Sequence, residues 1–351
     1  MKKILVLYRE LAGYFVASLN HLCSVHGVQA DVVAYPVNKD APFSFSFAEG
    51  ITVTPKDQAD LQNLKEKLNQ GHYDLIFCGG WSDPDYMNLV KQSPKVTSLL
   101  GFDKQWLGTM RDVAAIIYLR LTATCHFDFA FVPGHEQKQF ARRMGFRSDQ
   151  IVEGAYACDE EVFESVFAAK QTNARTPRPR QIWFAGRYVQ EKSVLEMFQY
   201  TAELLNGALA DWELHCIGTG PLWNQRLIHP RIIHHGFVQP SEMQALIQMG
   251  EVFIMPSRYE PWAISVHEFA TSGFALLLSD RIGSRFSFLK AGKNGLVFPY
   301  RDWKVFQSQL TTLCRLNSQE LARMGTVSHE LAIQVNRESW SQSLIAMMKR
   351  L

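Results

Sequence analysis

Short apolar runs alternate with helical patterns along this chain, and the alternation constrains the fold more than any other feature. In the first half, candidate strands occur at residues 4–8, 30–35, 74–79, 96–100 and 129–134. Between most of these runs, apolar residues recur at three- and four-residue spacing, as at Leu19, Leu22 and Val25. Strands that alternate with helices predict a parallel sheet that is covered on both faces. The sequence therefore predicts an α/β fold.

One segment that is poor in apolar residues divides the pattern. AKQTNARTPRPRQ, residues 169–181, contains two prolines and three arginines and is typical of a linker. After it the pattern restarts, with candidate strands at residues 182–186, 213–218, 232–237, 252–256 and 275–280. A chain of 351 residues is also long for one hydrophobic core. We expect two doubly wound domains, residues 1–168 and 182–336, that face each other across a deep cleft.

Composition excludes several classes of protein. The net charge is only +2, which gives no reason to expect a nucleic-acid partner. The six cysteines show no CxxC spacing, so we expect buried thiols and a cytoplasmic location. No apolar run approaches the ~18 residues of a membrane span. The N-terminal MKKILVLYRE has an apolar run too short for a signal peptide.

Glycines and cations follow the first two strands of the second half. In IWFAGRYVQEKS, Arg187 comes directly after Gly186, and Lys192 stands near the start of the next helix. Two cations beside a helix N-terminus suit a diphosphate, although solvated surface charges can have the same spacing. HCIGTGPL contains Gly218 but lacks the third glycine of a dinucleotide fingerprint. It predicts a tight turn beside a nucleotide.

Two adjacent histidines, His234 and His235, lie in the next candidate strand. Neighbouring strand residues face opposite sides of a sheet, so the two imidazoles are badly placed to hold one metal ion. No cysteine or acid stands near them at metal-ligand spacing. We expect no metal there.

The stretch YEPWAISVHE contains two acids on either side of a predicted helix start. Pro261 suits the first turn of a helix, which puts Glu260 in the loop and Glu268 within the helix. The free N–H groups near the helix start would attract a phosphate group, and they belong to Ala263, Ile264 and Ser265. Acidic first turns are common in helices. The stretch alone therefore does not distinguish a binding site from an ordinary helix start.

Taken together, the motifs resemble those of retaining glycosyltransferases of family 4, which have the GT-B fold. The chain has, in order, Gly-Arg-x4-Lys, Gly-Thr-Gly-Pro, His-Gly-Phe-Val and Pro-Ser-x2-Glu-x7-Glu. The resemblance covers about residues 180–300 and extends weakly to IVEGAYACDEEVF, residues 151–163. Within the family, the chain is similar to lipopolysaccharide- and capsule-type hexosyltransferases.

The resemblance implies roles for four charged residues in the second half. Arg187 and Lys192 match the cations that neutralise the donor diphosphate in place of a metal. Glu260 matches the acid that holds the hydroxyls of the donor sugar, and Glu268 matches the one that binds the ribose. Neither acid is then a nucleophile or a general base.

The resemblance also implies roles outside these motifs. The backbone around Phe237 and Val238 matches the region that contacts the base, and Gly13 stands where the family has paired glycines near the phosphate. SLLGFDKQW, residues 98–106, resembles a stretch of lipopolysaccharide-core glucosyltransferases, which makes Asp103 and Lys104 candidate catalytic residues. The C-terminal helix, residues 337–351, is expected to cross back onto the first domain.

Three positions depart from the family pattern. Trp262-Ala263 replaces Phe-Gly, so a methyl group is expected to crowd the donor's approach, and Ala275 replaces a proline. Residues 98–106 also lack the histidine that many members carry near the sugar. These departures keep a second hypothesis open, in which the chain is a non-catalytic nucleotide-sugar-binding module or a partner in a glycan assembly complex. A nicotinamide-dependent oxidoreductase is a third, more distant hypothesis.

The resemblance implies transfer of a hexose from a nucleotide diphosphate sugar, with UDP favoured, to a hydroxyl of a glycan or lipid-linked acceptor. No metal or other cofactor is expected. GGWSDPDY, residues 79–86, offers Trp81 and Tyr86 either as platforms for an acceptor sugar or as packing residues. HEQKQFARRMGF, residues 135–146, is either an ordinary surface helix or a peripheral contact with the inner membrane leaflet.

Overall fold

The computed structural model describes residues 2–37, 42–172 and 180–349, which form two compact units. The first unit contains residues 2–37, 42–158 and 335–349, and the second contains residues 159–172 and 180–334. The second unit therefore begins before residue 168, because the helix that starts at Glu160 packs on other helices of that unit. Most of the predicted linker 169–181 falls on residues 173–179, which lie outside the described residues.

A seven-stranded parallel sheet forms the centre of the first unit, in the order β3-β2-β1-β4-β5-β6-β7. Alternate residues of β1 enter different cores: Ile4 and Val6 lie on one face, and Leu5 and Leu7 lie on the other. The strands are β1 (Lys3–Tyr8), β2 (Gln29–Ala34), β3 (Ile51–Pro55), β4 (Leu75–Gly79), β5 (Thr97–Gly101), β6 (Phe129–Val132) and β7 (Ile151–Glu153).

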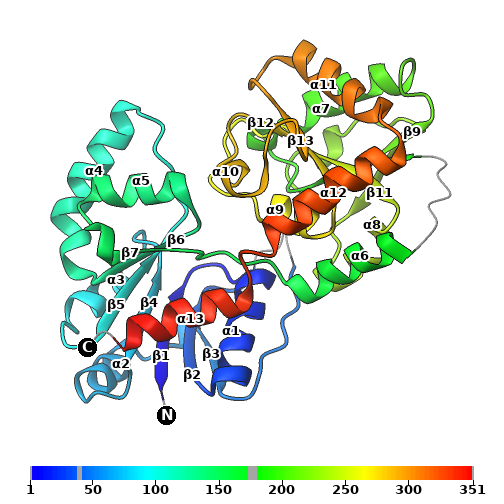
Figure 1. Cartoon of the computed structure of the whole chain (residues 1–351). Coiled ribbons are helices and arrows are strands. Elements are labelled where there is room, and N and C mark those ends of the chain that lie inside the picture. The colour runs from blue at the N-terminus through cyan, green and yellow to red at the C-terminus, as the bar shows by residue number, and fades with distance from the viewer. Residues whose placement is uncertain (1, 38–41, 173–179, 350–351) are drawn as a thin grey trace. The chain divides into compact units, whose positions relative to one another are not determined.

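Helices cover both faces of this sheet (Figure 1). One face carries α1 (Gly13–His26) and α13 (Arg337–Met348). The other carries α2 (Leu61–Asn69), α3 (Pro84–Lys91), α4 (Met110–Thr122) and α5 (His135–Met144). Short 3-10 turns, η1 (Lys56–Gln58), η2 (Thr124–His126) and η3 (Ser148–Gln150), complete the unit.

The last helix of the chain belongs to the first unit, where it lies beside α1 (Figure 1). The indole N–H of Trp340 donates to the carbonyl oxygen of Ala155 at 3.0 Å, and its ring meets the edge of the Phe15 ring. Glu338 accepts hydrogen bonds from both His21 and His26 of α1, each at 2.9 Å. Core packing and a polar contact thus hold α13 on α1.

A six-stranded parallel sheet forms the centre of the second unit, in the order β10-β9-β8-β11-β12-β13. Its strands are β8 (Arg180–Ala185), β9 (Trp212–Ile217), β10 (Ile232–Gly236), β11 (Gly250–Met255), β12 (Ala275–Ser279) and β13 (Gly295–Phe298). The helices are α6 (Glu160–Thr172), α7 (Val194–Leu205), α8 (Pro240–Ile247), α9 (Ile264–Thr271), α10 (Arg285–Phe288), α11 (Trp303–Arg315) and α12 (Ser318–Ala332), with 3-10 turns η4 (Gln190–Lys192) and η5 (Trp223–Gln225).

The two doubly wound parallel sheets confirm the predicted α/β fold. The prediction lacked the strands β3, β7 and β13, all of which are short edge strands. In each sheet the strand order reverses beside the first strand, between β1 and β4 and between β8 and β11. Loops at such a switch point form the usual ligand site of open α/β sheets.

Two expectations about exposure need correction. Cys125 is exposed, whereas the other five cysteines are buried. The apolar residues that made 135–146 a candidate for membrane contact, Phe140, Met144 and Phe146, are buried in the first unit, so α5 does not offer them to a bilayer. Among the described residues, the helices are all too short or too polar to span a membrane.

Candidate active site

Backbone hydrogen bonds join the loops that follow three neighbouring strands of the second unit. The amide of Gly186 donates to the carbonyl oxygen of Ile217 at 3.0 Å, and the amide of Tyr188 donates to that of Thr219 at 2.8 Å. The amide of Gly218 in turn donates to the carbonyl oxygen of Gly236 at 2.7 Å. The loops after β8, β9 and β10 therefore form one layer at the carboxyl edge of the sheet.

The turn after β9 needs both glycines of its Gly-Thr-Gly sequence, because the backbone of the loop after β8 lies directly against it. A Cβ atom on Gly218 would lie 2.1 Å from the carbonyl oxygen of Gly186, and one on Gly220 would lie 2.8 Å from that of Tyr188. Both glycines also have positive φ, 128° and 151°. The predicted tight turn is thus present, and its glycines let the loops after β8 and β9 touch.

An ion pair joins the loop after β8 to the loop after β11. The ammonium group of Lys192 contacts the carboxylate of Glu260, and both side chains are largely buried. One residue earlier, the carbonyl oxygen of Glu191 accepts the amide of Arg258 at 2.9 Å. The pairing brings together the residues assigned to the diphosphate and to the sugar, while Arg187 lies exposed on the same loop as Lys192.

The backbone of Glu260 is held from its other side by the loop after β12. Its amide donates to the carbonyl oxygen of Arg281 at 3.2 Å, and its own carbonyl oxygen accepts the amide of Gly283 at 2.9 Å. The acid is therefore fixed by neighbours on two loops. A carboxylate held in this way can orient a ligand hydroxyl without losing much further freedom on binding.

Ala263 is the N-cap residue of helix α9, which begins at Ile264, and its backbone has φ 66° and ψ 83°. This left-handed conformation favours glycine, which explains why the family pattern has glycine where this chain has Ala263. The residue is only 6% exposed, so little of its methyl group is open to solvent. No described side chain caps the helix, and the N–H groups of Ile264 and Ser265 lie in its first turn. The helix start can therefore accept an anion.

Glu268 lies within α9 and is largely buried. Burial raises the pKa of its carboxyl group to about 7, and the nearby charge of Asp159 adds to the increase. The group can thus be protonated or ionised near neutral pH. Either form can hydrogen-bond to a hydroxyl, as a donor or as an acceptor.

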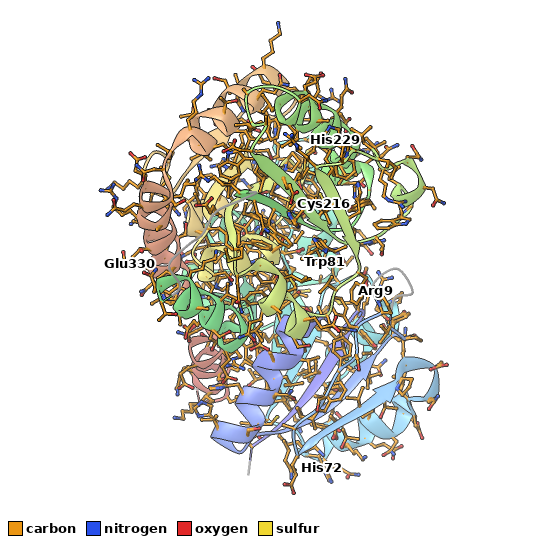
Figure 2. The ribbon with its side chains drawn as sticks, turned by 90° about the vertical axis from the view of Figure 1, so that its right-hand side faces the viewer. Arg9, His72, Trp81, Cys216, His229 and Glu330 are labelled. Atoms are coloured by element: carbon orange, nitrogen blue, oxygen red, sulfur yellow. The ribbon has the colours of Figure 1, made fainter. Side chains whose placement is uncertain are left out.

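The first unit contains a cavity of about 400 Å³ at the carboxyl ends of β1, β4 and β5. Arg9 and Trp81 both line it (Figure 2). The predicted candidates Asp103 and Lys104 lie in its wall, after β5, and Lys104 forms an ion pair with Asp112 at 3.0 Å. Gly13 begins α1 and does not belong to the lining.

Three tyrosines that the sequence did not single out also line this cavity: Tyr8, Tyr14 and Tyr156. Burial is the main cause that raises the pKa of Tyr8 to about 12, and burial also raises the pKa values of the other two. The hydroxyls therefore remain protonated at neutral pH. A cavity with neutral hydroxyls, aromatic rings and the two carboxylates of Glu10 and Asp103 suits a polyhydroxylated ligand.

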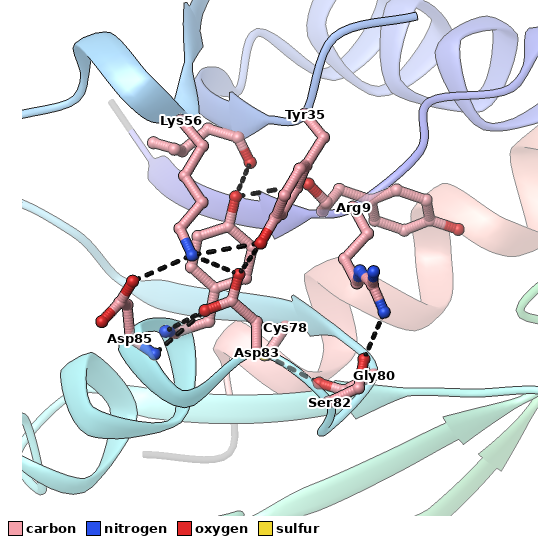
Figure 3. A network of polar contacts seen from close by, with 11 residues as sticks. Arg9, Tyr35, Lys56, Cys78, Gly80, Ser82, Asp83 and Asp85 are labelled. Carbon is pink, nitrogen blue, oxygen red and sulfur yellow. Dashed lines mark hydrogen bonds and ion pairs between the residues drawn. The ribbon is translucent and has the colours of Figure 1, made fainter. Parts of the chain in front are cut away.

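A polar network fixes the loop after β4 beside the cavity (Figure 3). Asp83 accepts from Lys56 at 2.6 Å and from the Tyr35 hydroxyl at 2.9 Å, and it caps α3. On the same loop, the Ser82 hydroxyl accepts from the Arg9 guanidinium at 3.0 Å. Tyr86 is buried and therefore packs rather than offering its ring to an acceptor.

The remaining predicted residues are also placed. Phe237 and Val238 follow β10 and are partly buried. His234 and His235 point to different partners: the Tyr188 hydroxyl lies 2.8 Å from His234, and His215 lies 3.0 Å from His235. In the second unit, the structure thus brings Gly186, Lys192, Gly218 and Glu260 together, with Ala263 to Glu268 on the chain that follows.

The second unit also matches a known family. Residues 179–315 match the family model described as glycosyl transferases group 1. Over these residues, the second unit is similar to group 1 glycosyl transferases. The glycine loops, the Lys192–Glu260 pair and the start of α9 all lie within the matched residues. A comparison with curated protein sequences found no match.

Solved structures resemble this chain over its whole length. Sucrose-phosphate synthase from Thermosynechococcus elongatus is 15% identical, with a TM-score of 0.72 over 100% of this chain and 99% of that one. A glycosyltransferase from Rickettsia africae is 11% identical, with a TM-score of 0.77 over 99% and 98%. HepE from Anabaena, in complex with UDP-glucose, is 13% identical, with a TM-score of 0.73 over 100% of both chains. The likeness confirms the predicted GT-B fold.

Proposed function

We propose that this chain is a retaining glycosyltransferase that moves a hexose from a nucleotide diphosphate sugar to a hydroxyl of a glycan or glycolipid. The observation that carries the proposal is the group of cations, glycine loops and helix start around the Lys192–Glu260 pair. UDP-sugars are the favoured donors, because the solved structure of HepE contains UDP-glucose. A second similar structure is a lipopolysaccharide outer core galactosyltransferase, which supports a glycan or glycolipid acceptor.

The donor diphosphate is assigned to the cationic end of this group. Arg187, Lys192 and the N–H groups of Ile264 and Ser265 would surround it, with Gly186 and Gly218 letting the backbone approach. Phe237 and Val238 would contact the base, and Glu268 the ribose. Negative charge grows on the diphosphate as the glycosidic bond breaks, so fixed positive groups stabilise the transition state more than the ground state.

The transfer itself breaks the bond between the anomeric carbon and the diphosphate oxygen, and the diphosphate keeps the electron pair. The acceptor hydroxyl oxygen bonds to the anomeric carbon on the same face, and its proton passes to the departing diphosphate. Glu260 orients the sugar hydroxyls and does not attack. In this proposal protein cations replace a metal, and no other cofactor takes part.

The acceptor is assigned to the cavity of the first unit. Its tyrosine hydroxyls and the partly exposed Trp81 ring can bind a sugar, and Asp103 can hydrogen-bond to the reacting hydroxyl. The free thiols of the described cysteines suit a cytoplasmic location, which the proposal adopts.

A screen of nucleotide sugars by thermal shift tests the donor class, because a bound donor stabilises the fold by mass action. Turnover of the best donor, with and without added glycan, then tests transfer. We expect Arg187→Ala to reduce turnover by about two to three orders of magnitude. The matched control is Arg323→Ala, which removes an exposed arginine from α12 and should keep full activity.

Near-normal turnover of a folded Arg187→Ala protein would overturn the assignment of the diphosphate site. Stabilisation by a nucleotide sugar without transfer or hydrolysis would instead favour the non-catalytic binding module.

A further inference from the structure

Helix α4 of the first unit presents an apolar face to solvent. The exposed fractions are 83% for Met110, 57% for Ile117, 64% for Tyr118 and 76% for Leu121. Val113 and the preceding Leu107 are exposed as well. Met110, Val113, Ile117 and Leu121 follow one another at intervals of three or four residues, and Tyr118 lies beside them, so they form one stripe along the helix. Among the described residues, six of the thirteen exposed large apolar side chains belong to this stripe or to Leu107 just before it.

The opposite face of α4 is also apolar, but it is buried. Ile116 and Leu119 enter the core of the first unit, where they pack with residues of α5 and the sheet. A helix that is apolar on both sides is normally covered on both sides. The buried face therefore accounts for the fold of α4 and leaves the exposed stripe without a structural role.

The first turn of α4 is firmly anchored, so the stripe belongs to a formed helix. Thr109 and Asp112 make a capping box, and Asp112 also forms an ion pair with Lys104 at 3.0 Å. Burial opposes ionisation of Asp112, but the hydrogen bonds from Lys104 and Thr109 outweigh it and lower the pKa of this carboxyl group. Asp112, the only acid of α4, is thus buried and paired with a cation, so it presents no negative charge to solvent.

The charges that remain exposed on α4 are both positive. Arg111 lies in the first turn and Arg120 in the last, and the residues from Val113 to Thr122 include no acid. On the adjacent α5, the guanidinium group of Arg143 lies 4.7 Å from the centroid of the Trp106 ring. The backbone carbonyl oxygen of Arg143 accepts a hydrogen bond from the Arg120 side chain at 2.8 Å. An apolar stripe flanked by arginines is complementary to a surface that combines acyl chains with anionic headgroups.

We propose that α4 is a membrane-interface helix, which lies in the plane of an anionic lipid surface with its apolar stripe in the acyl region. The partner is a bilayer surface rather than a second copy of the chain. A two-fold contact through this stripe would bring Arg111 and Arg120 toward their own copies with no exposed acid of α4 to pair them. Binding to lipid does not depend on the proposed glycosyl transfer.

Helix α4 lies close in the chain to the cavity of the first unit, which connects the proposed membrane surface with the acceptor. The loop Gly101–Lys104 lines the cavity of the first unit and leads through residues 105–109 into α4. A bilayer bound at α4 would present headgroups to the same unit that is assigned to the acceptor. Under the proposed function, the inference narrows the acceptor to lipid-linked molecules.

Cosedimentation of the full chain with vesicles tests the proposal. We expect the chain to bind vesicles of phosphatidylcholine mixed with phosphatidylglycerol, and to bind pure phosphatidylcholine more weakly. The double variant Ile117→Ser/Leu121→Ser should weaken binding by about tenfold or more for each apolar side chain removed. Arg111→Gln and added salt should weaken it further, because both reduce attraction to anionic headgroups.

The matched control is Leu227→Ser/Ile228→Ser, which removes two exposed apolar side chains from the second unit and should leave binding unchanged. All variants change exposed residues, and circular dichroism checks that they fold. Equal sedimentation with and without vesicles would overturn the proposal, as would equal binding by the two double variants. A dimer in sedimentation velocity that Ile117→Ser/Leu121→Ser dissociates would assign the stripe to a second copy and also overturn it.

Discussion

Lys192 and Glu260, which lie 68 residues apart in the chain, form a largely buried ion pair that connects the loops after β8 and β11. These two strands flank the position where the order of the second sheet reverses. The pair therefore lies at the point where a ligand of this fold is expected. A donor that binds here has to interact with Lys192 and Glu260 while these two side chains also contact each other.

The first prediction concerns the energy of that pair. In a double-mutant cycle with Lys192→Met and Glu260→Gln, we expect a coupling free energy of about 1–3 kcal/mol in urea unfolding, because each single change leaves a buried partner uncompensated. The control cycle is Glu191→Gln with Arg258→Met, an exposed pair at 3.3 Å in the same loops. It should give a coupling below about 1 kcal/mol. Similar coupling in both cycles would contradict the assignment.

The second prediction concerns the contact between Gly186 and Gly218. Gly218→Ala places a methyl group against the Gly186 carbonyl oxygen, so the two loops must separate. We expect a loss of about 2 kcal/mol or more in the free energy of unfolding. Gly207→Ala is the control, since its added Cβ would meet only ordinary contacts. If both variants unfold at the same urea concentration, the close approach does not constrain the loops.

The third prediction concerns the start of α9. Ala263→Gly removes a buried methyl group but also relieves a left-handed alanine, so we expect a net change within about 1 kcal/mol. Ala270→Gly, a buried alanine in the last turn of the same helix, has no strain to relieve and should cost about 2 kcal/mol. Urea unfolding of the two variants measures the difference. A larger loss for Ala263→Gly would show that its backbone is not strained.

The fourth prediction concerns pH. The pKa of Glu268 is raised from 4.5 to about 7, so between these values the folded chain holds a proton that the unfolded chain has lost. This contribution to stability is therefore highest at low pH and falls by about 1.4 kcal/mol per pH unit up to about pH 7. The total loss is about 3 kcal/mol.

Urea unfolding of Glu268→Gln and the wild type at several pH values isolates this effect. We expect the variant to gain stability relative to the wild type as the pH rises toward 7, and then to keep a constant lead. Asp159→Asn should reduce the gain, because the Asp159 charge contributes to the shift. Parallel stability curves for Glu268→Gln and the wild type would rule out the raised pKa.

Interior strands could be predicted from the sequence, whereas three of the four edge strands could not. Runs such as ILVLY in β1 are apolar throughout because both faces of a parallel sheet are covered. Edge strands are shorter and partly exposed, as in ITVTP of β3, so their pattern is weak. The β7 strand has three residues and β13 has four, which is too few for periodicity to register.

The site could be predicted as a set of motifs but not as a set of contacts. Spacing placed Arg187, Lys192 and Glu260 near strand ends, yet nothing in the sequence indicates that Lys192 pairs with Glu260. The cavity tyrosines were missed because Tyr8, Tyr14 and Tyr156 come from separate segments. The apolar face of α5 was visible in the sequence, but only packing reveals that it is buried while that of α4 is exposed.

The return of α13 to the first unit has a consequence for the order of folding during synthesis. Trp340, Leu344 and Met347 belong to the core that β1 and α1 begin, so one face of the first sheet stays partly uncovered until the ribosome has made residues 335–349. The second unit needs none of these residues and can close earlier. The domain that leaves the ribosome first is therefore the last to be completed, and in the meantime its exposed apolar face is a natural target for chaperones.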